Sequence, residues 1–250
     1  MSNEHETSNV AVAPTIHRAD SRGSADFGWL QSRHTFSFAN YFNPERIQFG
    51  ALRVLNDDIV AGGQGFGTHP HRDMEIISIP LYGALEHKDS MGTGSVIRPG
   101  EVQIMSAGTG VQHSEYNASP ADVVNFLQIW ILPEKLRIPP RYEQKAVDFD
   151  KYRDQLVTVV SPDRDEPNAV WINQAARFSI GRLSAGVEVD YRRLREGNGV
   201  YVFVIDGDAE LTDYDLQLGR RDAAGLSDDE NVRLKARTDS HVLLIDVPMF

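Results

Sequence analysis

The sequence predicts an all-β protein built from two similar units. Short apolar stretches recur roughly every 8 to 12 residues, and residues typical of turns stand between them. The second half repeats this pattern, and no stretch before Pro133 shows a convincing helical period. The residues alone therefore favour a β-sandwich or a β-barrel in each half.

Composition limits the classes of partner. The chain has 250 residues, of which 41% are hydrophobic, and its net charge of −11 disfavours nucleic acid as a general partner. Cysteine is absent, which excludes disulfides, thiolate zinc sites and cysteine nucleophiles. We find no apolar run of about 18 residues and no apolar core of a signal peptide near the start. We therefore expect a cytoplasmic protein with no membrane contact.

The first half contains the clearest strand patterns. The expected strands cover residues 26–40, 47–55, 76–82 and 123–132. The first has an aromatic face at period two, and Asn56-Asp57-Asp58 after the second is expected to be a turn. Gly83 ends the third strand and Pro133 ends the last. A glycine-rich loop over 62–67 leads into the segment that contains the paired histidines.

The second half resembles a weaker copy of the first. Residues 201–207 match 76–83 in pattern, and residues 242–248 match 123–133. These limits divide the chain into expected parts. They are a flexible tail (1–14), an N-terminal metal-binding unit (15–133), a linker (134–152) with a possible short helix over 142–152, and a C-terminal unit (153–250).

Two short segments of the first half carry pairs of metal-binding side chains. Alternate residues of a strand point to the same face, so His69 and His71 form one pair, and His113 and Glu115 form another. Three neutral nitrogens and one carboxylate suit a mononuclear metal site with open positions. Glu75 shares strand parity with His71, so the residues alone leave open which carboxylate belongs to the site.

The second half offers no equivalent donors. If Gly83 and Gly207 correspond, the positions of His69 and His71 are filled there by Arg193 and Arg195. His241 is the only histidine of that half. We therefore expect one metal per chain, held in the first half.

The motifs resemble the cupins, and more narrowly the pirin family of two-domain cupins. Gly63, His69, His71, Glu75 and Gly83 match the first cupin motif with one extra residue before the last glycine. The second motif departs from the general pattern, because Ser106 replaces its usual proline and two extra residues precede Gly110 and His113. These departures are pirin-like, as are the segments 32–38, 52–58, 69–72, 85–90 and 113–115. The resemblance covers residues 15–250 and is densest in the first half.

The resemblance implies two cupin barrels of the jelly-roll type packed face to face, a bicupin, with metal only in the N-terminal barrel. It implies His69, His71, His113 and Glu115 as the ligands, and leaves Glu75 a structural or supporting role. The first expectation for the cofactor is one Fe(II) ion. Mn, Co, Ni, Cu or Zn could occupy the same donors, because ligand type alone does not separate these ions.

Members of this family resemble flavonol dioxygenases, which cleave quercetin with O2 and release carbon monoxide. The resemblance therefore implies a small aromatic enolisable substrate and O2 as reaction partners. Glu115 could act as the base that takes the substrate's 3-hydroxyl proton. Two alternatives stay open: a dioxygenase for another enolisable molecule, and a metal-dependent module that binds a transcription regulator without turnover.

Three further residues are of interest for the pocket. His87 lies just past Gly83, where it could contact substrate or serve as a hairpin histidine with its own partner. Gln128 is a polar residue in an apolar strand and needs a partner if it faces inward, which makes it a candidate for the pocket wall. His34 is expected to play a structural role, covering the end of the barrel.

Overall fold

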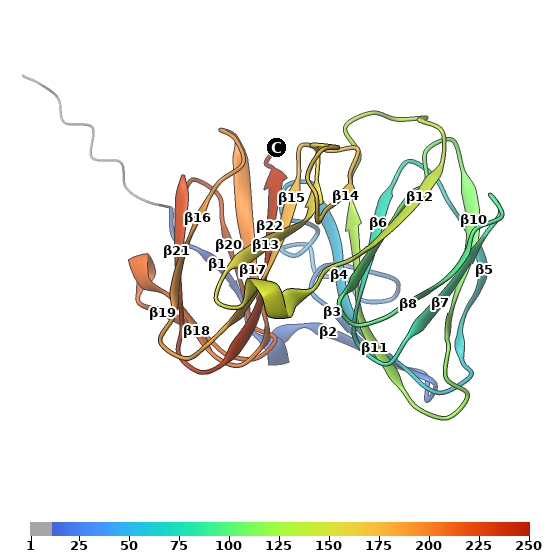
Figure 1. Ribbon diagram of the computed structural model, residues 1–250, viewed down its shortest axis with the longest axis horizontal. Helices are drawn as coiled ribbons and strands as arrows, with labels where there is room; N and C mark the ends of the chain where they lie inside the picture. Colours follow the sequence, from blue (N-terminus) through green and yellow to red (C-terminus); the bar gives the residue numbers. More distant parts are fainter. Residues whose placement is uncertain (1–11) are drawn as a thin grey trace, which may run out of the picture.

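The computed structural model describes residues 12–250, which form two β-structures side by side (Figure 1). Residues 1–11 of the expected tail lie outside the described residues. The helical segments that the structure describes are 3-10 turns, η1 (Ala19–Ser21), η2 (Phe149–Tyr152) and η3 (Thr212–Tyr214). None of them is long and apolar enough to cross a membrane.

The strands of the first half follow in order along the chain. They are β2 (Gly23–Asp26), β3 (Leu30–His34), β4 (Leu52–Val60), β5 (Gly65–His71), β6 (Glu75–Tyr82), β7 (Leu85–Asp89), β8 (Gly94–Ile97), β9 (Glu101–Ser106), β10 (Val111–Asn117), β11 (Val124–Ile131) and β12 (Arg141–Ala146). Those of the second half are β13 (Leu156–Ser161), β14 (Val170–Trp171), β15 (Arg177–Leu183), β16 (Glu188–Arg192), β17 (Asn198–Asp206), β18 (Ala209–Leu211), β19 (Leu216–Leu218), β20 (Ala223–Leu226), β21 (Asn231–Ala236) and β22 (Ser240–Pro248). Strand β1 (Thr15–His17) precedes them all.

Each half is a sandwich of a seven-stranded and a four-stranded sheet. The strand orders are β12-β9-β6-β11-β4-β3-β2 over β5-β10-β7-β8, and β1-β20-β17-β22-β15-β13-β14 over β16-β21-β18-β19. The expected all-β bicupin fold is confirmed, although the sheets of each half do not join into one closed barrel. The repeat read from the sequence is visible in the pairing: β6 lies between β9 and β11, as β17 lies between β20 and β22.

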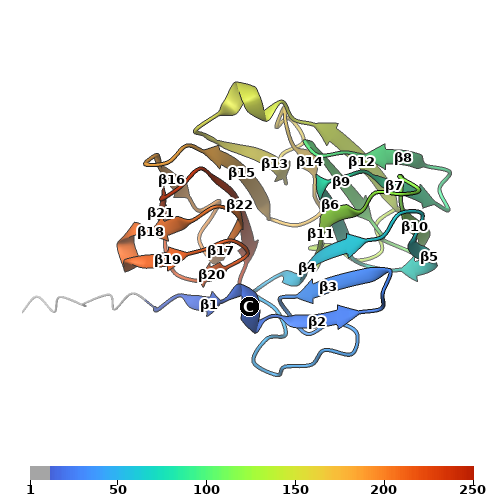
Figure 2. The same cartoon turned by 90° about the horizontal axis from the view of Figure 1, so that it is seen from below.

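The two seven-stranded sheets exchange their edge strands. Strand β12 lies within the segment expected to be a linker, and it pairs with β9 of the first half. Strand β1, expected in the N-terminal unit, instead pairs with β20 of the second half. Figure 2 shows β1, in blue, beside the orange strands of the second half. Each edge strand satisfies backbone groups that a sheet edge would otherwise leave unpaired, which explains why both segments are ordered.

The halves pack together through the outer faces of the seven-stranded sheets. Along β6, Ile77 and Ile79 face the other half, whereas Ile76 packs inside its own sandwich. The shared layer includes Phe178 and Tyr201 from the second half, both fully buried. Each such side chain contributes about 1.5–3 kcal/mol by leaving water, so this layer makes the two halves one structural unit.

The segment Asn56-Asp57-Asp58 is not a turn, contrary to expectation, but lies in the middle of β4. Tertiary pairing on both sides decides this, because β4 is hydrogen-bonded to β3 and to β11 along these residues. Alternation sends Asn56 and Asp58 into the first sandwich and Asp57 toward the second half. The polar residues therefore mark two buried sites rather than a loop.

A buried ion pair joins the halves at Asp57. The Arg221 Nε donates to Asp57 Oδ2 at 2.7 Å, and the two side chains are only 10% and 11% exposed. Asn125 donates from Nδ2 to the other carboxylate oxygen, Asp57 Oδ1, at 2.7 Å. Removing one partner of such a pair leaves an uncompensated charge away from water.

We expect Arg221→Met to lower the free energy of unfolding by roughly 3 kcal/mol, because Asp57 would stay buried without its cation. Urea unfolding followed by circular dichroism measures this change. The double variant Arg221→Met with Asp57→Asn should recover much of the loss, since neither position of the pair then carries a charge. A loss below about 1 kcal/mol in the single variant would mean that the pair behaves as an exposed one.

Candidate metal centre and its cavity

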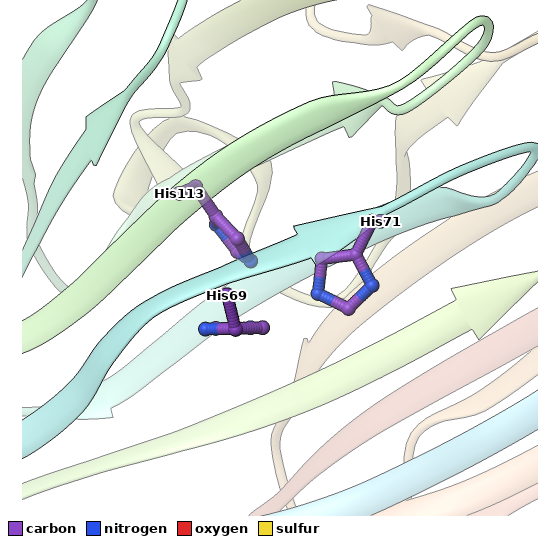
Figure 3. Close-up of side chains that lie close together, drawn as sticks. All are labelled: His69, His71 and His113. Carbon is purple, nitrogen blue, oxygen red and sulfur yellow. The ribbon is translucent and has the colours of Figure 1, made fainter.

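Three histidines from two neighbouring strands of the four-stranded sheet form one cluster. His69 and His71 come from β5, and His113 on β10 lies directly opposite His69 in the register. The centroid of the His69 ring lies 4.5 Å from that of His113 and 4.8 Å from that of His71, and the His71 and His113 centroids are 4.9 Å apart. Their donor atoms lie within 4.8 Å of one another. Figure 3 shows the three rings close together, with His69 and His71 beside the cyan strand and His113 on the neighbouring green strand.

The hydrogen bonds of these rings leave nitrogens free for a cation. His69 Nδ1 lies 2.8 Å from the Gly67 carbonyl oxygen, which can only accept, so Nδ1 carries the proton and Nε2 keeps its lone pair. Both ring nitrogens of His113 are buried and have no partner among the described residues. Buried polar atoms normally have partners, so these orphaned nitrogens fit a bound divalent metal.

Burial also sets the charge of the cluster. Desolvation lowers the pKa of His113 to about 2, with the neighbouring His69 and His71 adding to the effect. Desolvation lowers the pKa of His71 to about 4, again with help from His69. Both rings are therefore neutral near pH 7, which is the form that binds a metal.

Glu115 lies beside the cluster on β10, after a register irregularity between His113 and Glu115. Its carboxylate accepts from Ser78 Oγ at 3.0 Å and from Gln128 Nε2 at 2.6 Å. Burial raises its pKa to about 7, against the opposing effect of these two hydrogen bonds. Its ligand atom groups with those of His87 and His113 within 4.8 Å. Its role as fourth ligand beside His69 and His71 stays a prediction.

Glu75 points away from the histidines. Asp73, in the left-handed region with φ +48°, lies between β5 and β6 and breaks the strand parity that had linked Glu75 to His71. The Glu75 carboxylate instead accepts from Ser106 Oγ at 2.8 Å and from the Asn173 backbone N–H of the second half at 3.2 Å. Its position fits the structural role that the family resemblance implied.

His87 lies on β7 directly opposite Glu115 and is fully buried. Its Nε2 lies 3.1 Å from Asp89 Oδ2, so the structure favours the alternative of a hairpin histidine with its own partner. His87 is not among the residues that line the cavity described next, so its contact with substrate stays a prediction. In the four-stranded sheet, β10 lies between β5 and β7, so His87 is one strand further from β5 than His113 is.

A cavity of about 460 Å³ opens onto the cluster. His69, His71 and Glu115 lie on its wall, together with Gln128. Much of the remaining wall is aromatic, formed by Phe27, Trp29, Phe38, Tyr41, Phe66 and Trp130. Its size and apolar lining are typical of a site for a small, flat organic molecule.

Sequence reasoning missed part of the cavity wall. Asn56 and Asp58 line it, and so does His34, which was expected to cover the barrel end instead. Burial raises the pKa of Asp58 to about 7, against the opposing effect of a Ser32 hydrogen bond and with smaller contributions from Asp57 and Glu115. The alternation of polar residues along 56–58 could have indicated an inward-facing pair, but adjacent Asn and Asp residues read as a turn.

The second half has no comparable cluster. Arg193 and Arg195 follow β16 and donate to Asn198, Arg193 Nη1 to the backbone oxygen at 3.0 Å and Arg195 Nε to Oδ1 at 3.3 Å. Within the described residues, the groups of three donors that could hold a metal both lie in the first half. These arginines lie between β16 and β17 and hydrogen-bond to the first residue of β17, whereas His69 and His71 lie within β5.

Comparisons with known proteins match a different family model to each half of the chain. The family model "Pirin" matches residues 16–131, and the model "Quercetinase C-terminal cupin domain" matches residues 158–247. Quercetin 2,3-dioxygenase of Escherichia coli strain K12 is 42% identical over 233 residues, which are 93% of this chain and 98% of that protein. A pirin-like protein of Caulobacter vibrioides is 37% identical over 91% of this chain and 96% of its own length.

A solved structure shares the whole fold. The crystal structure of the bacterial pirin YhhW of Escherichia coli, in complex with nickel(II), superposes with a TM-score of 0.88 at 39% identity. The match covers 95% of this chain and all of that one.

Proposed function

The chain belongs to the pirin family, and from this premise we propose that it is a metal-dependent dioxygenase that cleaves flavonols such as quercetin with O2. The names of its relatives support a cupin oxidoreductase. The observation that carries the proposal is the opening of an aromatic-walled cavity onto three histidines with free nitrogens. A planar, enolisable molecule fits such a wall, and its oxygens would lie at the histidine end.

The donors define what the site would hold. His69, His71 and His113 would bind one divalent metal, with Glu115 as the proposed fourth ligand. When bound, the metal would supply a positive charge that favours the ionised form of the substrate's enol group. Fe(II) is the ion we propose. The related pirin YhhW is in complex with nickel(II), and ligand type alone does not separate the divalent ions.

The protein's own residues would position the substrate and take its proton. The aromatic side chains around the cavity exclude water and restrict a flat ring system to a few orientations. Glu115 lies on the cavity wall, where one carboxylate oxygen could accept the enol proton. Gln128 and Ser78 each donate to this carboxylate and fix its orientation.

Oxygen consumption tests the proposal directly. Protein freed of metal with a chelator and reloaded with Fe(II) should consume O2 when quercetin is added, releasing carbon monoxide in equal amount. The metal-free protein should not react faster than buffer. Because free iron also oxidises quercetin, Fe(II) without protein is the necessary background.

The carbon monoxide measurement makes the test specific. Fully loaded protein that consumes O2 with quercetin no faster than the iron control would contradict the proposed activity. That result would leave a dioxygenase for another enolisable molecule and the metal-dependent regulatory module as the functions to be tested next.

A further inference from the structure

We propose that a polar strip on the cavity wall, formed by His34, Asn56 and Asp58, binds hydroxyl groups of the substrate that lie away from its metal-facing oxygens. The inference rests on the proposed function and specifies its substrate. The molecule would be an enolisable aromatic that carries further hydroxyl groups on its rings. Nothing in the family motifs or in the names of the relatives assigns these residues to a ligand.

Strand register places the strip. In the pairing of β3 with β4, His34 lies opposite Asn56, and Ser32 lies opposite Asp58. In the pairing of β4 with β11, Asn56 lies opposite Gln128, the residue that donates to Glu115. A continuous polar row thus crosses the inner face of the seven-stranded sheet and ends beside the candidate metal centre.

The atoms of the strip lack protein partners. His34 Nδ1, Asn56 Oδ1 and Asp58 Oδ1 are buried and have no hydrogen-bond partner among the described residues. The three residues are only 3%, 2% and 4% exposed. Leaving buried polar atoms unpaired is unfavourable, yet three of them line one cavity. A ligand that supplies the missing hydrogen bonds explains their retention.

Asp57, between the two strip residues of β4, shows that polar side chains on this strand can have hydrogen-bond partners within the protein. Asp57 lies between Asn56 and Asp58 but faces outward, where both its carboxylate oxygens have partners in Arg221 and Asn125. The unpaired atoms are thus confined to the side of β4 that faces the cavity. This contrast separates a ligand-binding strip from a generally polar strand.

The chemistry of the strip selects the ligand. Asn56 Oδ1 accepts, and Asp58, whose pKa burial raises to about 7, can accept or donate, so hydroxyl groups, which do both, are the complementary ligand groups. The surrounding wall includes Trp29, Phe66 and Phe38, which favour a flat ring. A site with buried hydrogen-bonding groups discriminates against analogues that lack the matching hydroxyl. Phenolic hydroxyls on a planar ring satisfy both requirements.

A pair of ligands tests this assignment. Quercetin and 3-hydroxyflavone share the 3-hydroxyl and 4-keto oxygens, but 3-hydroxyflavone lacks all the outer hydroxyl groups. We would measure their dissociation constants on the Fe(II)-loaded full chain without oxygen, so that no turnover occurs. We expect quercetin to bind at least about 5-fold more tightly, the effect of one net hydrogen bond.

Variants of the strip residues test whether the strip causes the preference for quercetin over 3-hydroxyflavone. Asn56→Leu and Asp58→Leu should each remove most of this preference while leaving 3-hydroxyflavone affinity and metal content nearly unchanged. Asp58→Asn keeps an oxygen acceptor and should retain part of the preference. Asp57→Asn, on the same strand but facing the other half, is the matched control and should leave the preference intact. Retained 3-hydroxyflavone binding shows that each variant is folded.

Three results would overturn the assignment. Equal affinity of the wild-type chain for both ligands would show that the strip does not bind hydroxyl groups, while leaving the proposed reaction standing. A full preference for quercetin in both leucine variants would place the recognition elsewhere in the cavity. If neither ligand binds the loaded protein, the proposed function itself fails and the assignment fails with it.

Discussion

Replacing His69 and His71 together by alanine is expected to reduce the metal content of the purified protein from about one ion per chain to background. The pair supplies two of the three clustered imidazoles, so only His113 and the proposed ligand Glu115 would remain to hold the ion. Loss of an outer-shell partner already weakens metal binding by about 10- to 100-fold, so we expect a larger effect here. Elemental analysis of full-length protein after gel filtration measures it.

The second half provides the control for this experiment. Arg193→Gln with Arg195→Gln changes the residues that align with His69 and His71 in the sequence repeat. It should leave the metal content unchanged, because these side chains donate hydrogen bonds to Asn198. Two results would contradict a single site in the first half: metal retained by the histidine variant, or a metal content near two ions per wild-type chain. Metal lost from a folded arginine variant would show that the second half contributes to the site.

Glu115→Gln is expected to slow oxygen uptake with quercetin by about 10²- to 10⁴-fold at saturating metal, the usual contribution of a positioned base. The amide keeps the size of the side chain but loses its charge and nearly all of its basicity. The fold should tolerate it, since the Ser78 hydroxyl can rotate to accept from the new amide group. Raising the pH should restore part of the rate, because the substrate then arrives already ionised.

The buried carboxylate of Glu75 offers a matched comparison. Glu75→Gln alters the contacts with Ser106 and Asn173 at the boundary of the two halves, so it should lower stability rather than turnover. Oxygen uptake per bound metal should therefore stay close to the wild-type value. An unchanged rate in Glu115→Gln would remove its catalytic role, and loss of metal in Glu75→Gln would move the carboxylate ligand to Glu75.

The histidine cluster could be predicted from the sequence because it depends on a local rule. Alternate residues of one strand share a face, so His69 and His71 had to lie together once β5 formed. Their meeting with His113 depends on the pairing of β5 with β10, which the family resemblance implied and the register shows. The same rule failed for Glu75, because the left-handed Asp73 interrupts the strand before it.

The polar cavity wall and the edge strands could not be read in this way. Asn56 and Asp58 have strong turn preferences, and only hydrogen bonding to β3 and β11 holds them in a strand. Strands β1 and β12 are short and little apolar, so nothing local identifies the sheet that each would join. Both cases depend on contacts between segments distant in the sequence, which local patterns do not encode.

The exchange of β1 and β12 determines what would happen if the chain were cut. A break between residues 133 and 140 would leave β1 on the first fragment and β12 on the second, each separated from the sheet it completes. Either fragment alone would expose a sheet edge and the apolar layer that normally joins the halves, and would be prone to aggregate. Mixed from denaturant, the two fragments should reassemble into a complex, because each carries the strand that the other lacks.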